Sequence, residues 1–255
     1  MKKLILLVEL NSQRKTFFNL ENFKDKEFIS TNKGNIKILD IQECKWGEIV
    51  YTHKEFPYRV TPVSIVDYVI YGIKRETQII YPKDASYICY MLGLKNGFKV
   101  FECGTGSGSL TMFLANAVSE KGKVITYEKR EKFLNLAKKN IELMNLKDYV
   151  KFNLKDLEKE EICENDFDAA FIDVKEPWNL IPKVKDVLKG GKKLGLLVPT
   201  TNQISEVLKI LNNGFYNVSV QEILLRDYKI NPDRIRPEDR MVAHTGYLIF
   251  ANKGE

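Results

Sequence analysis

The chain has 255 residues, 44% hydrophobic and 29% charged, and its 40 Lys and Arg against 34 Asp and Glu give a net charge of +6. This composition predicts a globular protein of one or two domains and excludes an intrinsically disordered chain. No apolar run approaches the ~20 residues of a membrane-spanning helix. The early run Leu4–Val8 is too short for a secretory signal, so we expect a cytoplasmic protein without a membrane anchor.

Residues 1–60 are predicted to form a small β domain, because turn-forming residues separate short β-prone runs. These runs are Lys2–Leu10, Phe17–Leu20, Asn35–Ile41 and Glu48–Thr52. A helical linker is predicted over residues 61–81. Thr61 and Pro62 are typical of a helix start, and Val63–Tyr71 carries apolar residues at helical spacing.

From residue 82 to residue 255, helical and strand patterns alternate, which predicts an α/β domain with a mostly parallel sheet covered by helices. The helices are expected at Pro82–Leu92, Ser109–Val118, Glu131–Met144, Lys183–Leu188 and Ile204–Asn212. The strands are expected at Lys99–Glu102, Lys123–Glu128, Tyr149–Asn153, Phe167–Ile172, Lys193–Val198, Phe215–Leu225 and Gly246–Ala251. No helix separates the last two strands, so we expect them to form an antiparallel hairpin at the sheet edge.

A glycine-rich turn lies between the first strand of this domain and its helix. Residues Glu102–Gly108 have the order E-x-G-x-G-x-G, whereas a dinucleotide-binding turn reads G-x-G-x-x-G and would need glycine at Ser109. Glycines let the backbone approach a ligand, and the helix N-terminus offers free N–H groups. The Glu102 carboxylate would repel phosphates but favours a cation or an amino group, and S-adenosylmethionine carries both. The turn resembles motif I of the Rossmann-like class I methyltransferases.

Three acids follow successive predicted strands, where open α/β sheets bind ligands. Glu128 is placed to accept hydrogen bonds from two ribose hydroxyls, and Asp156 is placed to meet an adenine amino group. Asp173 is followed by Pro177 and Trp178, and a carboxylate beside an aromatic ring suits a purine with an exocyclic amine. Helix caps, turn residues and core packing remain the alternatives for these positions.

Two further features concern charge and metal binding. Five lysines lie within Lys183–Lys193, and five basic residues within Arg226–Arg240, so either segment is a candidate for phosphate contact or simply a solvated face. None of the four cysteines forms a C-x-x-C pair, and the chain has only His53 and His244. We therefore expect no metal site.

Four stretches together resemble the TrmI family of tRNA (adenine-58-N1)-methyltransferases. They are Gln78–Ala85, Glu102–Thr111, Asp173–Trp178, which is similar to the family's D-L-x-x-P-W, and His244–Leu248. The resemblance implies a class I methyltransferase fold with a mostly parallel seven-stranded sheet, preceded by the small β domain. It also implies S-adenosyl-L-methionine as the cofactor, tRNA as the substrate and a homotetramer.

The resemblance also implies roles for individual residues. Cofactor contacts are expected at Ile80, Tyr81, Glu102, Gly104, Ser107, Gly108, Ser109, Leu110, Glu128, Asp156 and Asp173. Asp173 would join cofactor and target adenine, and Tyr81 would line the target pocket as a second catalytic residue. Trp178, Gln203 and His244 are expected near the substrate. Some relatives have a tyrosine where this chain has Leu197, so a stacking role at that position is in doubt.

Two other functions remain open at this stage. The same fold serves protein (isoaspartyl) and small-molecule methyltransferases, because fold alone does not choose a substrate. A non-catalytic tRNA-binding subunit is the other alternative, although the complete glycine turn with Glu128 and Asp173 speaks against it. Methylation of adenine 57 in addition to adenine 58, as in some archaeal relatives, is a further alternative.

Overall fold

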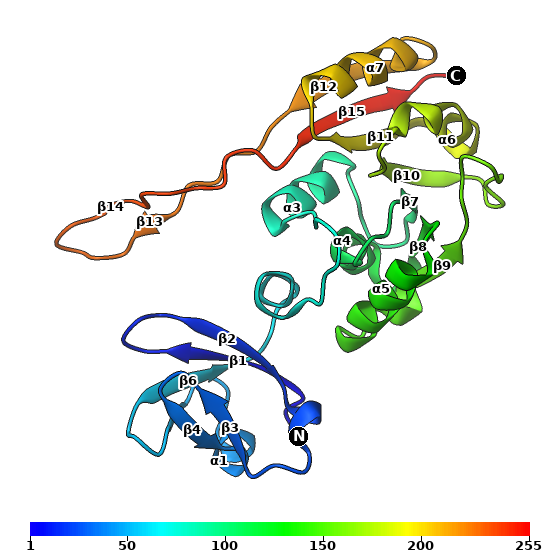
Figure 1. Cartoon of the computed structure of the whole chain (residues 1–255). Helices are drawn as coiled ribbons and strands as arrows, with labels where there is room; N and C mark the ends of the chain where they lie inside the picture. The colour runs from blue at the N-terminus through cyan, green and yellow to red at the C-terminus, as the bar shows by residue number, and fades with distance from the viewer. The chain divides into compact units, whose positions relative to one another are not determined.

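The computed structural model describes residues 1 to 255, and the chain forms two compact units, Met1–Ile73 and Lys74–Glu255 (Figure 1). The segment 61–81, predicted as a linker, is divided between them, with residues 61–73 in the first unit and 74–81 in the second. None of the helices is long and apolar enough to cross a membrane.

The first unit is built mainly from strands. They are β1 (Leu4–Glu9), β2 (Lys15–Asn19), β3 (Phe28–Thr31), β4 (Gly34–Lys37), β5 (Ile49–Tyr51) and β6 (Pro57–Thr61). Four of them form an antiparallel sheet in the order β2-β1-β6-β5, and β3 pairs with β4 as a separate hairpin. Apolar residues that alternate along the strands, such as Ile5 and Leu7, are fully buried in one core with Tyr58 and Val60.

The predicted elements of this unit were partly wrong. The strand predicted over Asn35–Ile41 ends at Lys37, and Ile38–Glu43 is helix α1, which buries Ile41. Strands β3 and β6 were missed. The following helix begins not at Pro62 but at Ile65, because Ser64 caps it in a capping box with Asp67. This helix, α2 (Ile65–Asp67), continues into the π-helical turn η2 (Tyr68–Gly72).

The second unit contains the predicted sheet. Its strands are β7 (Lys99–Cys103), β8 (Lys123–Glu128), β9 (Val150–Leu154), β10 (Phe167–Ile172), β11 (Leu188–Val198), β12 (Phe215–Gln221) and β15 (Tyr247–Lys253). They lie in the order β12-β15-β11-β10-β7-β8-β9. Only β15 runs against its neighbours, so the prediction of a mostly parallel seven-stranded sheet is confirmed. The last two strands, β12 and β15, pair antiparallel at one edge of the sheet, as predicted, and β15 lies between β12 and β11.

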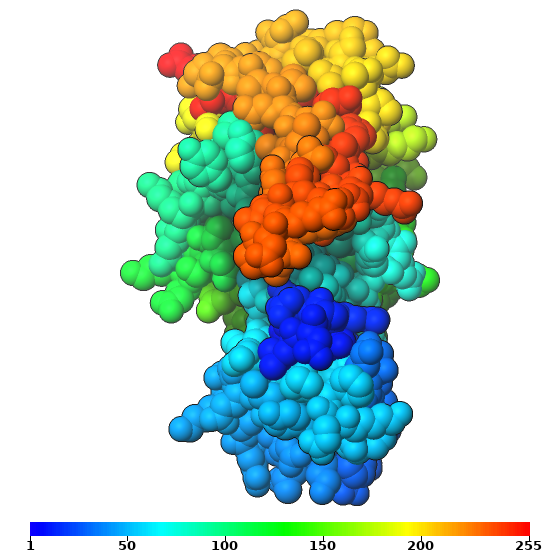
Figure 2. Space-filling model, turned by 90° about the vertical axis from the view of Figure 1, so that its left-hand side faces the viewer, coloured from blue at the N-terminus to red at the C-terminus, as the bar shows by residue number.

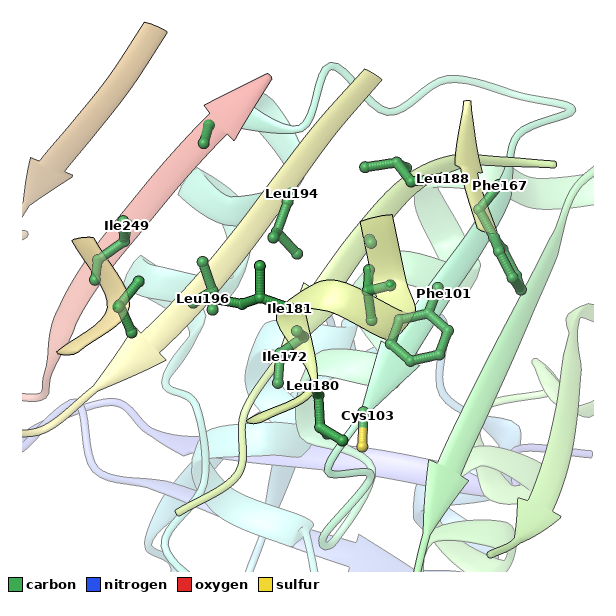
Figure 3. Packing of buried hydrophobic residues seen from close by; sticks show 14 of the residues in the cluster. Phe101, Cys103, Phe167, Ile172, Leu180, Ile181, Leu188, Leu194, Leu196 and Ile249 are labelled. Atoms are coloured by element: carbon green, nitrogen blue, oxygen red, sulfur yellow. The ribbon is translucent and has the colours of Figure 1, made fainter. Parts of the chain in front are cut away.

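Helices cover both faces of this sheet. They are α3 (Pro82–Met91), α4 (Ser109–Val118), α5 (Glu131–Leu143), α6 (Ile181–Val187) and α7 (Thr201–Leu211). Figure 3 shows one face, where Ile172, Leu196 and Ile249 pack with Ile181 of α6 in the larger core. Because neighbouring residues of a strand point to opposite faces, Phe250 packs on the other side, against the Tyr87 ring of α3.

A long excursion leaves the sheet between β12 and β15. We call residues 222–244 the arm. It carries the short antiparallel pair β13 (Tyr228–Lys229) and β14 (Arg236–Pro237). The strand predicted over Phe215–Leu225 therefore ends at Gln221, where the arm begins. The arm, orange in Figure 2, lies at the surface and exposes apolar side chains, among them Ile230 at 81% and Ile235 at 70%.

Candidate active site

A cavity of about 640 Å³ opens in the second unit at the carboxyl ends of the parallel strands. It is lined by residues that follow β7, β8, β9 and β10, and by the segment that precedes α3. This is the edge at which doubly wound α/β sheets bind their ligands, because loops from neighbouring strands diverge there. The cavity is therefore the candidate active site.

The glycine turn forms the floor of one end of the cavity. Gly104 has a φ of +96°, and a Cβ at this position would lie 1.9 Å from the carbonyl oxygen of Asp173. The Gly104 N–H donates to the Tyr127 carbonyl at 3.0 Å, and the Asp173 N–H donates to the Cys103 carbonyl at 2.8 Å. Only glycine fits this close approach, which locks the turn against the residue that follows β10.

The segment 74–81, which we call the strap, is hydrogen-bonded to the glycine turn. Ser109 Oγ donates to the Ile80 carbonyl at 2.6 Å, and the hydroxyls of Thr77 and Ser107 are 3.3 Å apart. Thr77 and Ile80 both line the cavity. Ser107 and Ser109 do not line it, so their side chains act on the strap from behind the turn.

Asn140 of α5 is a residue that the sequence reasoning missed. It is 1% exposed, and its Nδ2 donates both to the Lys74 carbonyl of the strap and to the Ser107 carbonyl of the glycine turn, each at 2.9 Å. One amide thus joins two chain segments that wall the cavity. A buried polar residue on a predicted apolar helix face was the only signal that could have indicated it.

Glu128 and Asp156 both line the cavity, as their strand-end positions predicted. The buried Glu128 carboxylate accepts from the Gly106 N–H at 3.0 Å, and its other oxygen accepts from the N–H and Nε of Arg130, each at 3.1 Å. Asp156 accepts from the Glu158 N–H at 3.2 Å. Both acids are held in place by backbone donors, so they present fixed acceptors to a ligand.

Glu102 lies behind the turn rather than in the cavity. It is 1% exposed, does not line the cavity, and accepts a hydrogen bond from Thr111 Oγ1 at 2.7 Å. Burial raises the pKa of Glu102 to about 7, against the hydrogen bonds from Thr126 and Thr111, and the neighbouring carboxylates add to the shift. The structure thus places Glu102 beneath the glycine turn, where Thr111 holds its carboxyl group.

Asp173 faces the cavity where its two ends meet. Burial, and then the negative charge of Glu128, raise the pKa of Asp173 to about 7. A carboxyl group with such a pKa in a cleft is a candidate for a direct role in chemistry. It can accept a hydrogen bond from an exocyclic amine and stabilise a cation that develops nearby.

The other end of the cavity, which we call the Thr245 end, lies beyond β10. Leu197, Pro199, Gln203 and Thr245 line it, together with Asp84 at the start of α3. Leu197 lies near the end of β11, Pro199 and Gln203 follow β11, and Thr245 precedes β15. The glycine turn and Asp156 instead follow β7 and β9, and Glu128 is the last residue of β8. The strand order thus separates the two ends, with the loop after β10 between them.

Comparison with known proteins decides the family. A model of the family described as "tRNA methyltransferase complex GCD14 subunit" matches residues 70–239. The chain belongs to this family. A relative from Methanocaldococcus jannaschii, named tRNA (adenine(57)-N(1)/adenine(58)-N(1))-methyltransferase TrmI, is 32% identical over 89% of both chains. The Thermus thermophilus tRNA (adenine(58)-N(1))-methyltransferase TrmI is 33% identical over 86% of both chains.

Solved structures agree on the fold. The crystal structure of TrmI, a tRNA (m1A58) methyltransferase from Aquifex aeolicus, has a TM-score of 0.87 and 36% identity and covers 99% of this chain and 97% of that chain. The crystal structure of a SAM-dependent O-methyltransferase from Thermotoga maritima has a TM-score of 0.93 and 40% identity. The match covers 100% of this chain and 95% of that chain. The predicted class I methyltransferase fold and the predicted TrmI family are both confirmed.

Three further residues predicted at the site, Tyr81, Trp178 and His244, also do not line the cavity. Tyr81 follows the lining residue Ile80 and caps α3, and its hydroxyl accepts from Arg75 Nη1 at 3.3 Å; this bond lowers the pKa of Tyr81. Trp178, in the short 3₁₀ turn η5 (Pro177–Asn179), packs against the core. His244 is exposed and bonds Glu222 at 2.6 Å.

Gln203 lines the Thr245 end, but its amide is already engaged. Its Nε2 donates to the Lys175 carbonyl at 3.0 Å, and its Oε1 accepts from Thr200 Oγ1 at 3.0 Å. Gln203 therefore ties the start of α7 to the loop that follows Asp173. The remaining predicted residues, Gly108 and Leu110, belong to the turn and the first turn of α4 and are buried away from the cavity.

The lysines of Lys183–Lys193 do not form a free basic surface. Lys189 and Lys192 both pair with Asp168, at 2.7 and 3.8 Å, at the start of β10 and so at the opposite end of the sheet from the cavity. Lys183 donates to the Leu157 and Glu160 carbonyls. No group of three or more His, Cys, Asp or Glu side chains is arranged to hold a metal ion.

Proposed function

We propose that this chain transfers a methyl group from S-adenosyl-L-methionine to N1 of adenine 58 in the T-loop of tRNA. The observation that carries the proposal is Asp173, which lies on the cavity between the glycine turn and the Thr245 end. Family membership supports the reaction and the substrate. A tRNA substrate also favours a cytoplasmic location.

The residues at the glycine end fit the proposed cofactor. The close approach at Gly104 leaves backbone exposed to a ligand, and Glu128 and Asp156 offer fixed acceptors for ribose hydroxyls and an adenine amine. When bound, S-adenosylmethionine supplies an electrophilic methyl group. We propose direct contacts with the cofactor at Ile80, Gly104, Glu128, Asp156 and Asp173, which line the cavity. In this proposal Tyr81, Ser107, Gly108, Ser109 and Leu110 hold the strap and the glycine turn around the cofactor, and Glu102 acts through its charge.

Asp173 orients the acceptor base in this proposal. Its carboxylate accepts a hydrogen bond from the N6 amine and fixes the ring, and adenine N1 already has an in-plane lone pair, so no strong base is required. Alignment and exclusion of water then supply most of the rate. Methylation at N1 makes the base cationic, and the nearby carboxylate stabilises that charge.

The Thr245 end is proposed to receive the adenine. Gln203 fixes the loop after Asp173, and Tyr81 is proposed to reach the base from the end of the strap. Leu197 lines this end where some relatives have a tyrosine, so the wall there is aliphatic and offers apolar contact without stacking. Trp178 supports the loop from the core, and we propose that His244 acts at the root of the arm and not on the base.

The arm is proposed to contact tRNA and other copies of the chain. Arg234 and Arg240 make no ion pair within the chain, so they are available for phosphates, unlike the lysines of Lys183–Lys193. Exposed Ile230 and Ile235 favour burial against another copy of the chain. We propose that the copies assemble as a homotetramer. Adenine 58 lies within folded tRNA, so the enzyme must expose it as other base-modifying enzymes do.

The test is methyl transfer from labelled S-adenosylmethionine to an unmodified tRNA transcript, followed by mapping of 1-methyladenosine to position 57 or 58. We expect 1-methyladenosine with the unaltered chain and none with Asp173→Ala. Asp168→Ala is the matched control, because this acid lies at the opposite end of the same strand. No transfer to tRNA despite measured cofactor binding would refute the proposal.

A second candidate is methylation of a hydroxyl group on a small molecule. The likeness to the Thermotoga maritima O-methyltransferase favours it. Small hydroxylated acceptors in the same assay would give a labelled product that contains no nucleoside, so the two functions are separated by one analysis.

A further inference from the structure

Two stretches of the chain that are far apart in sequence meet in one buried network. Lys83 Nζ donates to Asp84 Oδ1 at 2.8 Å and to Thr245 Oγ1 at 2.7 Å. Thr245 Oγ1 in turn donates to Asp84 Oδ2 at 2.8 Å. These residues come from Gln78–Ala85 and His244–Leu248, the first and last of the four stretches that resemble the TrmI family.

The network is fully partnered and largely removed from water. The Lys83 side chain is 11% exposed and that of Asp84 is 2% exposed. The third proton of the Lys83 ammonium goes to the Ile223 carbonyl at 2.8 Å, so every donor of the group is used. Burying an ion pair costs desolvation free energy, so the pair is weak evidence for stability. We therefore look for its role in fixing the positions of the elements that it joins.

The network fixes three elements at the Thr245 end of the cavity. Asp84 belongs to the first turn of α3, Thr245 stands just before β15, and Ile223 lies at the root of the arm. Asp84 and Thr245 line the cavity beside Leu197. The residue after Thr245 is Gly246, where a Cβ would come within 3.1 Å of the Leu197 side chain, so the wall is closely packed.

We propose that Lys83, Asp84 and Thr245 are positioning residues that hold the wall against which the acceptor base lies. This inference rests on the proposed function. Their side chains hydrogen-bond to one another and to the Ile223 carbonyl, and not to the glycine turn, Glu128 or Asp156. In this proposal they therefore fix the acceptor and leave cofactor binding to other groups. Since a shift of about 1 Å in a reacting group can cost a hundredfold in rate, a rigid wall has a direct kinetic consequence.

The test replaces Thr245 by Val, which keeps the shape of the side chain but removes the hydroxyl, and by Ser, which restores the hydroxyl. The measurements are kcat/KM for tRNA, cofactor affinity by calorimetry and the melting temperature. Thr52→Val is the matched control: this buried Thr in the first unit accepts from the Lys54 and Phe56 N–H groups, so its loss reports a general effect of removing a buried hydroxyl.

For Thr245→Val we expect kcat/KM for tRNA to fall about 10- to 100-fold, the effect of losing one hydrogen bond to a charged group. Cofactor affinity should stay unchanged, and Thr245→Ser should recover most of the activity. Unchanged kcat/KM, a parallel loss of cofactor affinity, or an equal loss in Thr52→Val would overturn the inference. If the unaltered chain does not methylate tRNA, the proposed function fails first and this inference fails with it.

Discussion

Replacement of Gly104 by Ala tests the close approach on which the site is built. The new Cβ would lie 1.9 Å from the Asp173 carbonyl oxygen and 2.8 Å from its carbonyl carbon. Cβ atoms essentially never approach another heavy atom within 3.0 Å, so the turn and the Asp173 backbone must separate by about 1 Å. The atoms met are backbone, which cannot rotate aside as a side chain can.

Gly104→Ala is expected to lower both the stability of the chain and its kcat/KM. A φ of +96° costs a non-glycine residue about 1–3 kcal/mol. The separation of about 1 Å adds strain, weakens the hydrogen bond from the Asp173 N–H to the Cys103 carbonyl, and displaces the Asp173 carboxylate. On the proposed function, a displacement of that size reduces kcat/KM about 100-fold.

Gly97→Ala is the control that separates the cost of a positive φ from the effect of the close approach. Gly97 has a φ of +92°, and a Cβ there would meet only the Lys121 Cβ, at an ordinary contact distance of 3.9 Å. Thermal unfolding, cofactor calorimetry and methyl transfer are measured for both variants. We expect both to lose stability through φ, and Gly104→Ala alone to lose cofactor affinity and rate. If the two variants are indistinguishable, the close approach has no functional importance.

Other predictions concern pH, the strap and the arm. Burial raises the pKa of Asp173 from 3.8 to about 7, so the free energy of unfolding falls as pH rises between these values. The melting temperature of Asp173→Asn should therefore exceed that of the unaltered chain at about pH 8. The difference should disappear at about pH 4. An equal difference at both pH values would contradict this sign. Asn140→Ala removes the hydrogen bonds that join the strap to the glycine turn, so the affinity for the cofactor, measured by calorimetry, should fall about tenfold. An unchanged affinity would show that the strap does not need Asn140 to stay in place. The double variant Arg234→Gln, Arg240→Gln should lower the slope of log K for tRNA binding against log salt concentration by about 2. Lys192→Gln should leave this slope unchanged, because Lys192 pairs with Asp168. Equal slopes for the two variants would show that the arm does not contact phosphates.

The sheet and the acids at its strand ends could be predicted because their signals are local. The strand Phe167–Ile172 contains the apolar run Ala169–Ile172, which is typical of a buried strand. Parallel pairing then brings Glu128, Asp156 and Asp173 to one edge of the sheet. Glycines with positive φ, such as Gly104, mark the turn in the same local way.

The strap and the network at Lys83 depend on contacts between distant parts of the chain. Asn140 looks like one polar residue on a helix, and only the tertiary fold places it between the strap and the glycine turn. In the segment Lys183–Lys193 the sequence suggested a surface for phosphate contact because five lysines lie close together. The pairing of Lys189 and Lys192 with Asp168 depends on the tertiary fold and could not be predicted. Charge clusters therefore indicate an interface only after internal partners are known.

Cys103, at the end of β7, lies among the carboxyl groups of the site. Burial raises the pKa of this thiol, and then the negative charges of Glu128, Glu102, Asp173 and Asp156 raise it further. Four carboxylates from four different places in the chain thus act on one point below the glycine turn. Because the pKa values of Glu102 and Asp173 are both raised to about 7, a ligand with a positive charge beside them would favour their ionised forms at neutral pH. The acid of the E-x-G-x-G-x-G order, although it does not line the cavity, is therefore one of the groups whose ionisation a cationic ligand would favour.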